Sequence, residues 1–222
     1  MGVTPGARVH GRLNLPALEA TLRRSQRRGL DESDGRDPLD DRVLGNLLAG
    51  YAYVDALIDA RVDAFAMGSL KHLLELNTLV LCGASPERRA AHAGHLQATE
   101  RRFYGDGAEG VRDVVEWVAA HRDASPWERA GGVYVTMLSR PQLFIEGNHR
   151  TGGLIMAYVL ARDAQPPFVL SPENAVLYFE ISASIRDIPK SSPAMRFRLS
   201  AATSAVASFL AAHADSRYLV AT

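Results

Sequence analysis

Apolar side chains recur every three or four positions along most of this chain, and this spacing predicts α-helices rather than strands. The pattern is continuous over residues 39–65 and again over residues 70–81, where Gly83 marks the end of the helix. Serine-proline pairs, which place an N-cap before a first-turn proline, predict helix starts at positions 85, 125 and 171. From the same signals, further helices are expected over residues 16–28, 86–102, 111–121, 126–139, 148–162 and 194–214 and directly after residue 173. The predicted fold class is all-α.

One of these helices differs from the others because it is apolar on every side. Residues 154–161 read Leu-Ile-Met-Ala-Tyr-Val-Leu-Ala, which predicts a helix that is buried all round. Pro166-Pro167 ends it, and residues 168–170 are expected to be extended. The chain holds no repeat, low-complexity tract or linker that would divide it. We therefore expect an N-terminal arm with a short helix over residues 1–38, and one helical domain with a C-terminal helix over residues 39–222.

Residues 103–110 break the helical pattern. Two aromatic residues, Phe103 and Tyr104, precede three glycines within six positions. Such a glycine-rich stretch predicts a turn or a small β-hairpin. The alternative, that the aromatic pair is core for the following helix, stays open.

Charge and cysteine content exclude several classes of function. The chain has 25 basic and 25 acidic residues, so its formal net charge is zero, and neither nucleic acid nor an anionic membrane is expected as a partner. The single cysteine, Cys82, excludes an intrachain disulfide and a multi-cysteine metal site and is expected to be a small buried apolar residue. No apolar run reaches the ~18 residues of a membrane span, and the first residues lack a signal-peptide core. A cytoplasmic location is expected.

The candidate chemistry lies in residues 142–153, Gln-Leu-Phe-Ile-Glu-Gly-Asn-His-Arg-Thr-Gly-Gly. A loop leads directly into the apolar helix, whose first-turn amides are unpaired donors at the positive end of the helix dipole. Gly147 lets a ligand approach the backbone, and Asn148 can cap the helix and still present its amide. Arg150 offers a planar fork for phosphate oxygens, and Glu146 is suited to hold Mg²⁺ that bridges to phosphates. Together these residues predict a site for phosphate and Mg²⁺.

A structural interpretation of the same residues also stays open. Asn148 can be an N-cap and nothing more, Gly147 a turn residue, and Glu146 with Arg150 an ion pair four residues apart on one helix. Phe144, directly before these residues, and the fully apolar helix behind them favour the phosphate site.

The segment resembles the Fic/Doc family, whose signature is His-X-Phe-X-(Asp/Glu)-Gly-Asn-X-Arg. Its positions are matched one for one by Phe144, Glu146, Gly147, Asn148 and Arg150. The resemblance extends, weakly outside the motif, over residues 39–185. It implies a mostly helical domain with a β-hairpin flap where residues 103–110 stand, along which an extended protein target can pair. It also implies transfer of AMP from ATP, or of a phosphate or phosphocholine group, to a protein hydroxyl.

The resemblance also implies roles for the matched residues. Glu146 is similar to the Mg²⁺ ligand of the family, and Gly147 and Asn148 are similar to its anion-hole positions. Arg150 is similar to the arginine that holds the distal phosphates, and Phe144 to the residue that anchors the loop in the core. ATP, or another phosphorylated donor, and Mg²⁺ are the cofactors expected.

Two positions depart from the family pattern. The leading histidine, which deprotonates the target hydroxyl in the family, is Gln142 in this chain. Because an amide has no accessible basic pKa, ordinary AMP transfer should lose the factor of ~10² to 10⁴ that general-base assistance supplies. The second arginine of the longer motif is Gly153, and the family's inhibitory pattern of Ser or Thr, then Glu four residues later, then Gly or Asn, is absent.

Two functional hypotheses follow. In the first, the chain is a Fic-type enzyme with altered chemistry, in which Gln142 orients a substrate and His149, in the variable position of the motif, acts as a substitute base. In the second, it is a catalytically inactive module that binds a nucleotide or a partner. His149 as a bystander is also compatible with the pattern. The oligomeric state and the target protein are not specified by the sequence.

Three weaker signals have ordinary structural interpretations beside functional ones. His92, His95 and Glu100 share a predicted helix, but a third ligand at matching spacing is missing, which disfavours a metal site. Arg101 and Arg102 are expected to be a solvated helix end, with phosphate or target contact as the alternative. Arg23, Arg24, Arg27 and Arg28 form a basic helix face, expected to be solvated or in contact with a partner.

Overall fold

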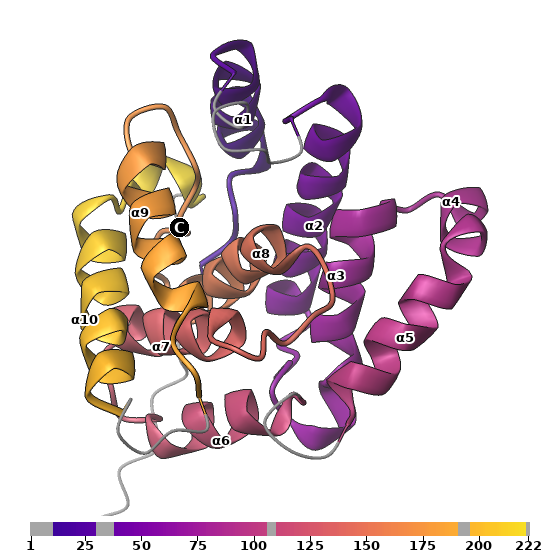
Figure 1. Ribbon diagram of the computed structural model, residues 1–222. Helices are drawn as coiled ribbons and strands as arrows, with labels where there is room; N and C mark the ends of the chain where they lie inside the picture. Colours follow the sequence, from indigo (N-terminus) through magenta and orange to yellow (C-terminus); the bar gives the residue numbers. More distant parts are fainter. Residues whose placement is uncertain (1–10, 30–37, 106–109, 191–195, 221–222) are drawn as a thin grey trace, which may run out of the picture.

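The computed structural model describes residues 11–29, 38–105, 110–190 and 196–220, and within these ranges it consists of helices joined by short loops (Figure 1). Its α-helices are α1 (Leu15–Arg27), α2 (Asp41–Asp59), α3 (Lys71–Cys82), α4 (Pro86–Ala91), α5 (Ala93–Phe103), α6 (Arg112–Ala120), α7 (Pro126–Leu138), α8 (Asn148–Ala161), α9 (Ala175–Arg186) and α10 (Arg196–Ala212). Two short 3₁₀ helices lie at Met67–Ser69 and Ser216–Tyr218. The described residues form no sheet, only two isolated bridges, which confirms the all-α class.

Helix α8 is the centre of the fold and is buried all round, as its apolar pattern predicts. Every residue from Leu154 to Ala161 is buried, and Figure 1 shows α8 between α7, α2 and α3. Glycines allow the closest approaches. A Cβ on Gly152 would lie 2.7 Å from the ring of Tyr134 on α7, and one on Gly131 of α7 would lie 3.0 Å from the Thr203 carbonyl oxygen on α10. Glycine thus lets α8 pack against the Tyr134 ring of α7, and lets α7 pack against the backbone of α10.

The single helix expected over residues 86–102 is two helices, so that prediction is wrong. Ser85 caps α4 as expected, with its hydroxyl accepting from the Arg88 N–H, but α4 ends at Ala91 and α5 begins at Ala93. Residues 90–94 are all exposed, and α4 buries none of its residues. Without an apolar face to hold it against the core, the chain turns at His92. The helix expected over 39–65 likewise ends earlier, at Asp59.

The helix expected directly after Ser171-Pro172-Glu173 begins later, at Ala175. Asn174 explains the shift, because its Oδ1 accepts from the N–H of Ser171 and its Nδ2 donates to the carbonyl of Val169. These bonds make residues 171–174 a separate turn before α9. Residues 168–170 take no part in a strand pair.

The β-hairpin expected over residues 103–110 is not seen in the part of this segment that is described, and residues 106–109 lie outside the described residues. Phe103 is the last residue of α5 and is fully buried, and its carbonyl accepts from the N–H of Val111. Tyr104, in contrast, is 48% exposed. Phe103 therefore belongs to the core, because its ring fills space beneath the loop that precedes α8.

The described residues before position 38 pack against the rest of the fold. Leu13 forms a bridge with Leu219, and Asn14 caps α1 through its side chain. Leu18 and Leu22 of α1 are buried. Among the described residues, no helix is both long enough and apolar enough to cross a membrane.

Candidate functional site

The loop between α7 and α8 is anchored by a buried aromatic residue. Phe144 is 1% exposed and its ring stacks on that of Phe103, with ring centres 5.7 Å apart and planes 10° apart. The N–H of Leu143, which is also buried, donates to the carbonyl of Met137 near the end of α7. The loop is therefore tied to the core at its middle, and its second half leads to the start of α8.

Asn148 is the first residue of α8, and Gly147 is its N-cap, so the expectation that Asn148 caps this helix is wrong. The Asn148 side chain bonds backwards into the loop. Its Oδ1 accepts from the N–H of Phe144 at 2.9 Å, and its Nδ2 donates to the carbonyl of Phe144 at 2.8 Å and to Oε1 of Gln142 at 3.2 Å. Both amide protons thus hold the loop in shape, and Asn148 does not present them to a ligand.

Gly147 is required by both conformation and packing. Its φ of +75° lies in the left-handed region, and a Cβ would approach Nδ2 of Asn77 to 3.1 Å. Asn77, buried on α3, donates from Nδ2 to the carbonyl of Glu146 and to the hydroxyl of Thr151. The N–H of Thr151 makes the first hydrogen bond within α8, to the Gly147 carbonyl. The amides of residues 148–150 therefore have no acceptor within the helix, as expected of a first turn.

Gln142 is held at both its backbone and its side chain. The Arg102 guanidinium donates from Nε and Nη2 to the Gln142 carbonyl, at 3.0 and 2.6 Å. Arg102 is therefore not simply a solvated helix end, because it fastens the end of α5 to the loop. Arg101 beside it is exposed, as expected. Gln142 does not line the cavity described next.

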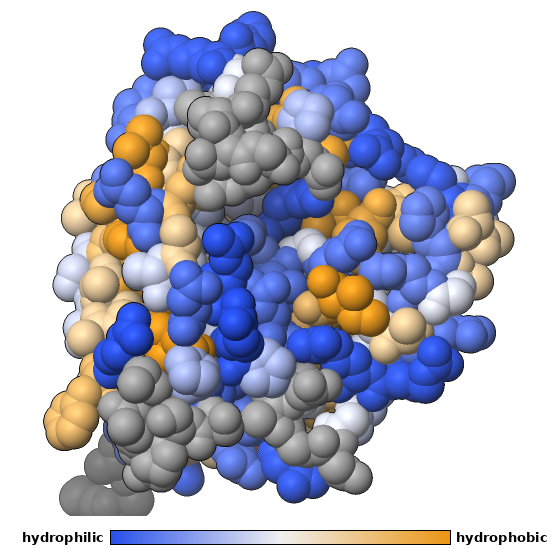
Figure 2. Space-filling view, viewed as in Figure 1, coloured by the Kyte–Doolittle hydropathy of each residue, from blue (hydrophilic) through white to orange (hydrophobic). Residues whose placement is uncertain are grey.

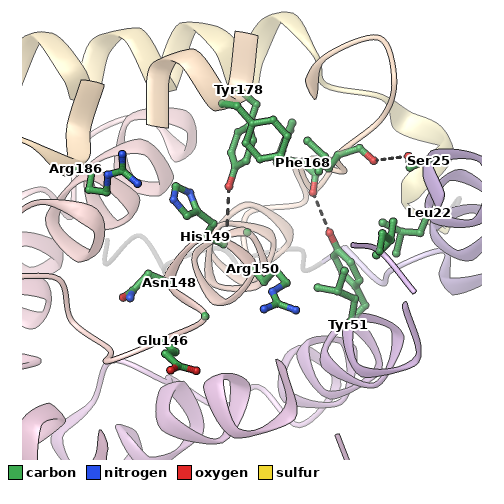
Figure 3. A pocket seen from close by; sticks show the side chains of 16 residues that line it. Leu22, Ser25, Tyr51, Glu146, Asn148, His149, Arg150, Phe168, Tyr178 and Arg186 are labelled. Carbon is green, nitrogen blue, oxygen red and sulfur yellow. Dashed lines mark hydrogen bonds between the residues drawn. The ribbon is translucent and has the colours of Figure 1, made fainter. Parts of the chain in front are cut away.

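A cavity of about 560 Å³ lies where the first turn of α8 meets α1, α2 and α9. On the face shown in Figure 2, hydrophilic side chains gather along the middle, between more apolar surfaces on either side. Figure 3 shows charged and polar groups on the side of the α8 N-terminus, and aromatic and aliphatic groups on the opposite side. The polar side is lined by Glu146, Gly147, Asn148, His149, Arg150, Gly153 and Arg186, and the apolar side by Leu22, Leu39, Leu47, Tyr51, Phe168, Leu170, Tyr178 and Phe179, with Ser25 among them.

Among the described residues, the polar side carries two guanidinium groups, on Arg150 and Arg186, and one carboxylate, on Glu146. Arg150 lies on the first turn of α8, and Arg186 is the last residue of α9. With the first-turn amides of α8, these groups make this side of the cavity attractive to an anion.

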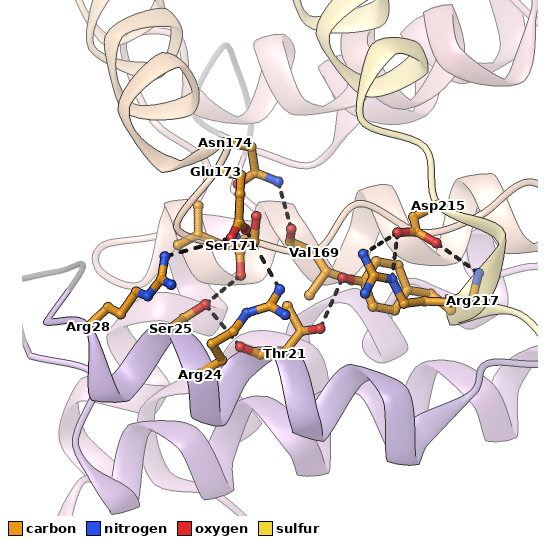
Figure 4. Close-up of polar contacts among 12 residues, drawn as sticks. Thr21, Arg24, Ser25, Arg28, Val169, Ser171, Glu173, Asn174, Asp215 and Arg217 are labelled. Carbon is orange, nitrogen blue, oxygen red and sulfur yellow. Dashed lines mark hydrogen bonds and ion pairs between the residues drawn. The ribbon is translucent and has the colours of Figure 1, made fainter.

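The apolar side is fixed by hydrogen bonds to the backbone of residues 168–170. Tyr51 donates to the Phe168 carbonyl at 3.3 Å, and burial raises the pKa of Tyr51, which therefore stays neutral. On α1, Ser25 donates to the Leu170 carbonyl at 3.1 Å, and Figure 4 shows Arg24 and Arg28 directed at Glu173. Helix α1 thus forms one wall of the cavity.

His149 lines the cavity and is held from behind by a buried hydroxyl network. Its Nδ1 lies 3.1 Å from the Tyr134 hydroxyl oxygen on α7. That oxygen also contacts the hydroxyls of Tyr178, at 2.9 Å, and Ser182, at 2.8 Å, both on α9. The network joins the α8 first turn to two neighbouring helices.

The described residues contain no group of three or more His, Cys, Asp or Glu side chains that could hold a metal ion by themselves. His92 and His95 are accordingly in no such group, and among the described residues Glu146 is the only acidic one that lines the cavity. Cys82 is buried, as expected, and burial raises the pKa of its thiol.

Sequence reasoning missed most of the residues that line this cavity, and four of them illustrate why. Ser25, Tyr51, Phe168 and Arg186 come from four separate segments, and each looks like an ordinary helix or loop residue in the chain. Tyr51 belongs to the apolar stripe of α2, which was the only available signal. No family model, curated protein or solved structure matches this chain.

Proposed function

We propose that this cavity binds a nucleoside triphosphate, or another phosphorylated donor, together with Mg²⁺, in a Fic-type protein. The observation that carries the proposal is the division of the cavity. One side offers first-turn amides and two guanidinium groups, and the other offers an aromatic wall. A nucleotide has the same division, with anionic phosphates at one end and a flat base at the other.

The phosphate end is assigned to the start of α8. The amides of residues 148–150 precede the first hydrogen bond within the helix, and they carry the positive end of its dipole. Arg150 adds a charged fork from the same turn, and Arg186 adds a second charge from α9. The side chain of Asn148 holds Phe144 and Gln142 in place and is not assigned to phosphate, whereas its backbone amide belongs to the first turn.

The base is assigned to the aromatic wall. Tyr51, Phe168, Tyr178 and Phe179 all line this side, and the Phe168 and Tyr178 rings stack at 5.0 Å between centres. A cavity of this volume lies within the range of ~300–1,000 Å³ typical of small-molecule sites.

Glu146 fits the proposed Mg²⁺ as one ligand among several, with substrate phosphates and water supplying the others. Mg²⁺ keeps several waters and is commonly bound by one or two carboxylates and substrate phosphates. A single carboxylate beside an anion site meets that need, whereas a dedicated metal cage needs further carboxylates, and the described lining residues include none. When bound, the ion would neutralise phosphate charge.

The second hypothesis, binding without turnover, is favoured over transfer by way of Gln142. The Gln142 side chain accepts a hydrogen bond from Asn148, its carbonyl is fixed by Arg102, and the residue does not line the cavity. Nothing about this placement gives the amide a basic group. Binding of the donor is therefore the primary proposal, and AMP transfer depends on a different base.

Titration calorimetry of the full chain with ATP and Mg²⁺ tests the proposal. Arg150→Ala should weaken affinity by about 1.5–3 kcal/mol, the range for hydrogen bonds to charged groups, or roughly 10- to 150-fold. Arg101→Ala removes an exposed arginine outside the cavity and should leave affinity unchanged. Equal affinities for the native chain and Arg150→Ala would remove the phosphate role of Arg150. Absence of binding by ATP, ADP and AMP at millimolar concentration would overturn the proposed function.

A further inference from the structure

The buried side chain of Asn77, on α3, reaches both segments that meet at the start of α8. Its Nδ2 donates to the Glu146 carbonyl at 2.9 Å and to the Thr151 hydroxyl at 3.0 Å, so both amide protons are used. Its Oδ1 is also buried and has no hydrogen-bond partner among the described residues. Because a buried oxygen without a partner costs free energy, the benefit of Asn77 must lie in the two bonds that its amide protons make.

These two bonds join the parts of the cavity that are assigned to Mg²⁺ and to phosphate. Glu146 carries the carboxylate, and the N–H of Thr151 makes the first hydrogen bond within α8. Figure 3 shows the side chains of Glu146 and Arg150 on the same side of the start of α8. Asn77 itself does not line the cavity, so it acts on a ligand only through the residues that it holds.

The residue between the two segments is a glycine, which makes the connection flexible by itself. Gly147 has a φ of +75°, and glycine populates positive and negative φ about equally well. Without a restraint, the peptide between Glu146 and Gly147 would be free to rotate, and the Glu146 carboxylate would move relative to the start of α8. The bond from Asn77 to the Glu146 carbonyl supplies this restraint.

We propose that Asn77 is a positioning residue, which holds the Glu146 carboxylate where one Mg²⁺ binds both this carboxylate and a phosphate oxygen at the first turn of α8. The inference rests on the proposed function, because it needs a phosphorylated donor in the cavity. Asn77 thus determines the part of the donor affinity that depends on Mg²⁺. Residues that support a metal ligand in this way typically change metal affinity by ~10- to 100-fold when they are replaced.

Titration calorimetry of the full chain with ATP, once with Mg²⁺ and once with EDTA, tests this role. In the native chain Mg²⁺ should strengthen ATP binding. Asn77→Ala should reduce this strengthening by ~10-fold or more, while the affinity measured in EDTA changes little. Asn77→Leu, which fills the space of the asparagine without its amide, should give the same result. With two variants of different size, the test does not depend on the folding of either one.

Asn46→Ala is the matched control. Asn46 is a buried asparagine on α2 whose Nδ2 also donates to a backbone carbonyl, that of Val80 on α3, at 3.1 Å. It does not line the cavity. Its replacement should lower stability and leave the ATP affinity unchanged both with Mg²⁺ and with EDTA.

Glu146→Gln separates positioning of the carboxylate from general support of the fold. This change should remove the Mg²⁺ effect by itself, and adding Asn77→Ala to it should cost nothing further, because both changes act on the same carboxylate. Equal losses with Mg²⁺ and with EDTA in Asn77→Ala, an unchanged Mg²⁺ effect, or additive losses in the double variant would overturn the inference. If the native chain binds ATP and Mg²⁺ adds nothing, the inference fails and nucleotide binding survives. If ATP does not bind, the proposed function itself fails.

Discussion

At the scale of single residues, Gln142 separates binding of a phosphorylated donor from its transfer. An amide cannot take a proton near neutral pH. Gln142 therefore does not supply the base for transfer from a bound donor. Its backbone is nonetheless fixed by Arg102 and its side chain by Asn148. Because Arg102 bonds the backbone of position 142, a side chain substituted there would start from a fixed backbone position.

This fixed position makes Gln142→His a sharp test of the proposed relation to the Fic/Doc family. If the donor is bound productively, the new imidazole should raise AMP transfer by ~10² or more, as general-base catalysis would. Intact-protein mass spectrometry after incubation with Mg-ATP would show the added AMP on the chain or on a target protein. Gln142→Asn, which shortens the amide without adding a base, is the control. A native chain that modifies a target and is slowed by Gln142→His would place Gln142 in a different reaction.

Local sequence pattern predicted some of the site residues, and long-range contacts decided the others. Gly147 stands out in the chain as a turn before an apolar helix, and Phe144 as an aromatic residue in a short loop. The backward bonds of Asn148 were missed because an asparagine before a helix usually caps it. Arg102, which lies 40 residues before Gln142, gives no local sign that it holds this loop.

At the scale of elements, α8 supplies the polar end of the cavity and α1 one of its walls. Complete burial of α8 could be predicted because its residues are apolar on all sides. The break between α4 and α5 could not, since nothing but the absence of apolar contacts at residues 90–94 interrupts the helix. The docking of α1 could not be predicted either, because its partners lie far along the chain, at Glu173 and Tyr218.

Two kinds of contact hold α1, and their magnitudes differ. Leu18 is fully buried, and Leu18→Ala should cost about 2–5 kcal/mol of unfolding free energy. The ion pairs of Glu173 with Arg24 and Arg28 are long, 3.7 and 3.8 Å, and half-exposed, so Glu173→Gln should cost less than about 0.5 kcal/mol. Urea denaturation of both variants measures the difference. Comparable losses would mean that the polar contacts of Figure 4, rather than apolar burial, hold α1 in place.

At the scale of the whole molecule, the two ends of the described chain meet against α2 and α8. The N–H of Val220 donates to the Arg12 carbonyl, and that of Gly11 donates to the Ala161 carbonyl at the end of α8. Arg12 then reaches α2, where it forms hydrogen bonds of 2.9 and 2.6 Å with the two carboxylate oxygens of Asp55. This carboxylate also accepts from the Leu13 N–H at 2.8 Å. The Asp55 carboxylate thus joins the ends of the described chain to α2, and Asp59 on the same helix is a second, more exposed partner of Arg12.

The charge state of Asp55 should make this connection sensitive to acid. Burial alone raises the pKa of Asp55, but the hydrogen bonds from Arg12 and the Leu13 N–H outweigh it and hold the pKa below its ordinary value. Because the folded-state pKa is the lower one, the carboxylate stabilises the fold above about pH 4, and this stabilisation disappears as the pH falls through the folded-state value. Since solvent reaches the Arg12 side chain, Asp55→Asn should lower the unfolding free energy at neutral pH by no more than about 1 kcal/mol.

Denaturant titrations of the native chain and of Asp55→Asn, from neutral pH into acid, measure the difference in unfolding free energy. Asp59→Asn, at the more exposed partner of Arg12, is the matched control. The difference in unfolding free energy between the native chain and Asp55→Asn should shrink on acidification. A difference that stays constant into strong acid would show that shape and hydrogen bonding, not charge, hold the ends of the described chain together.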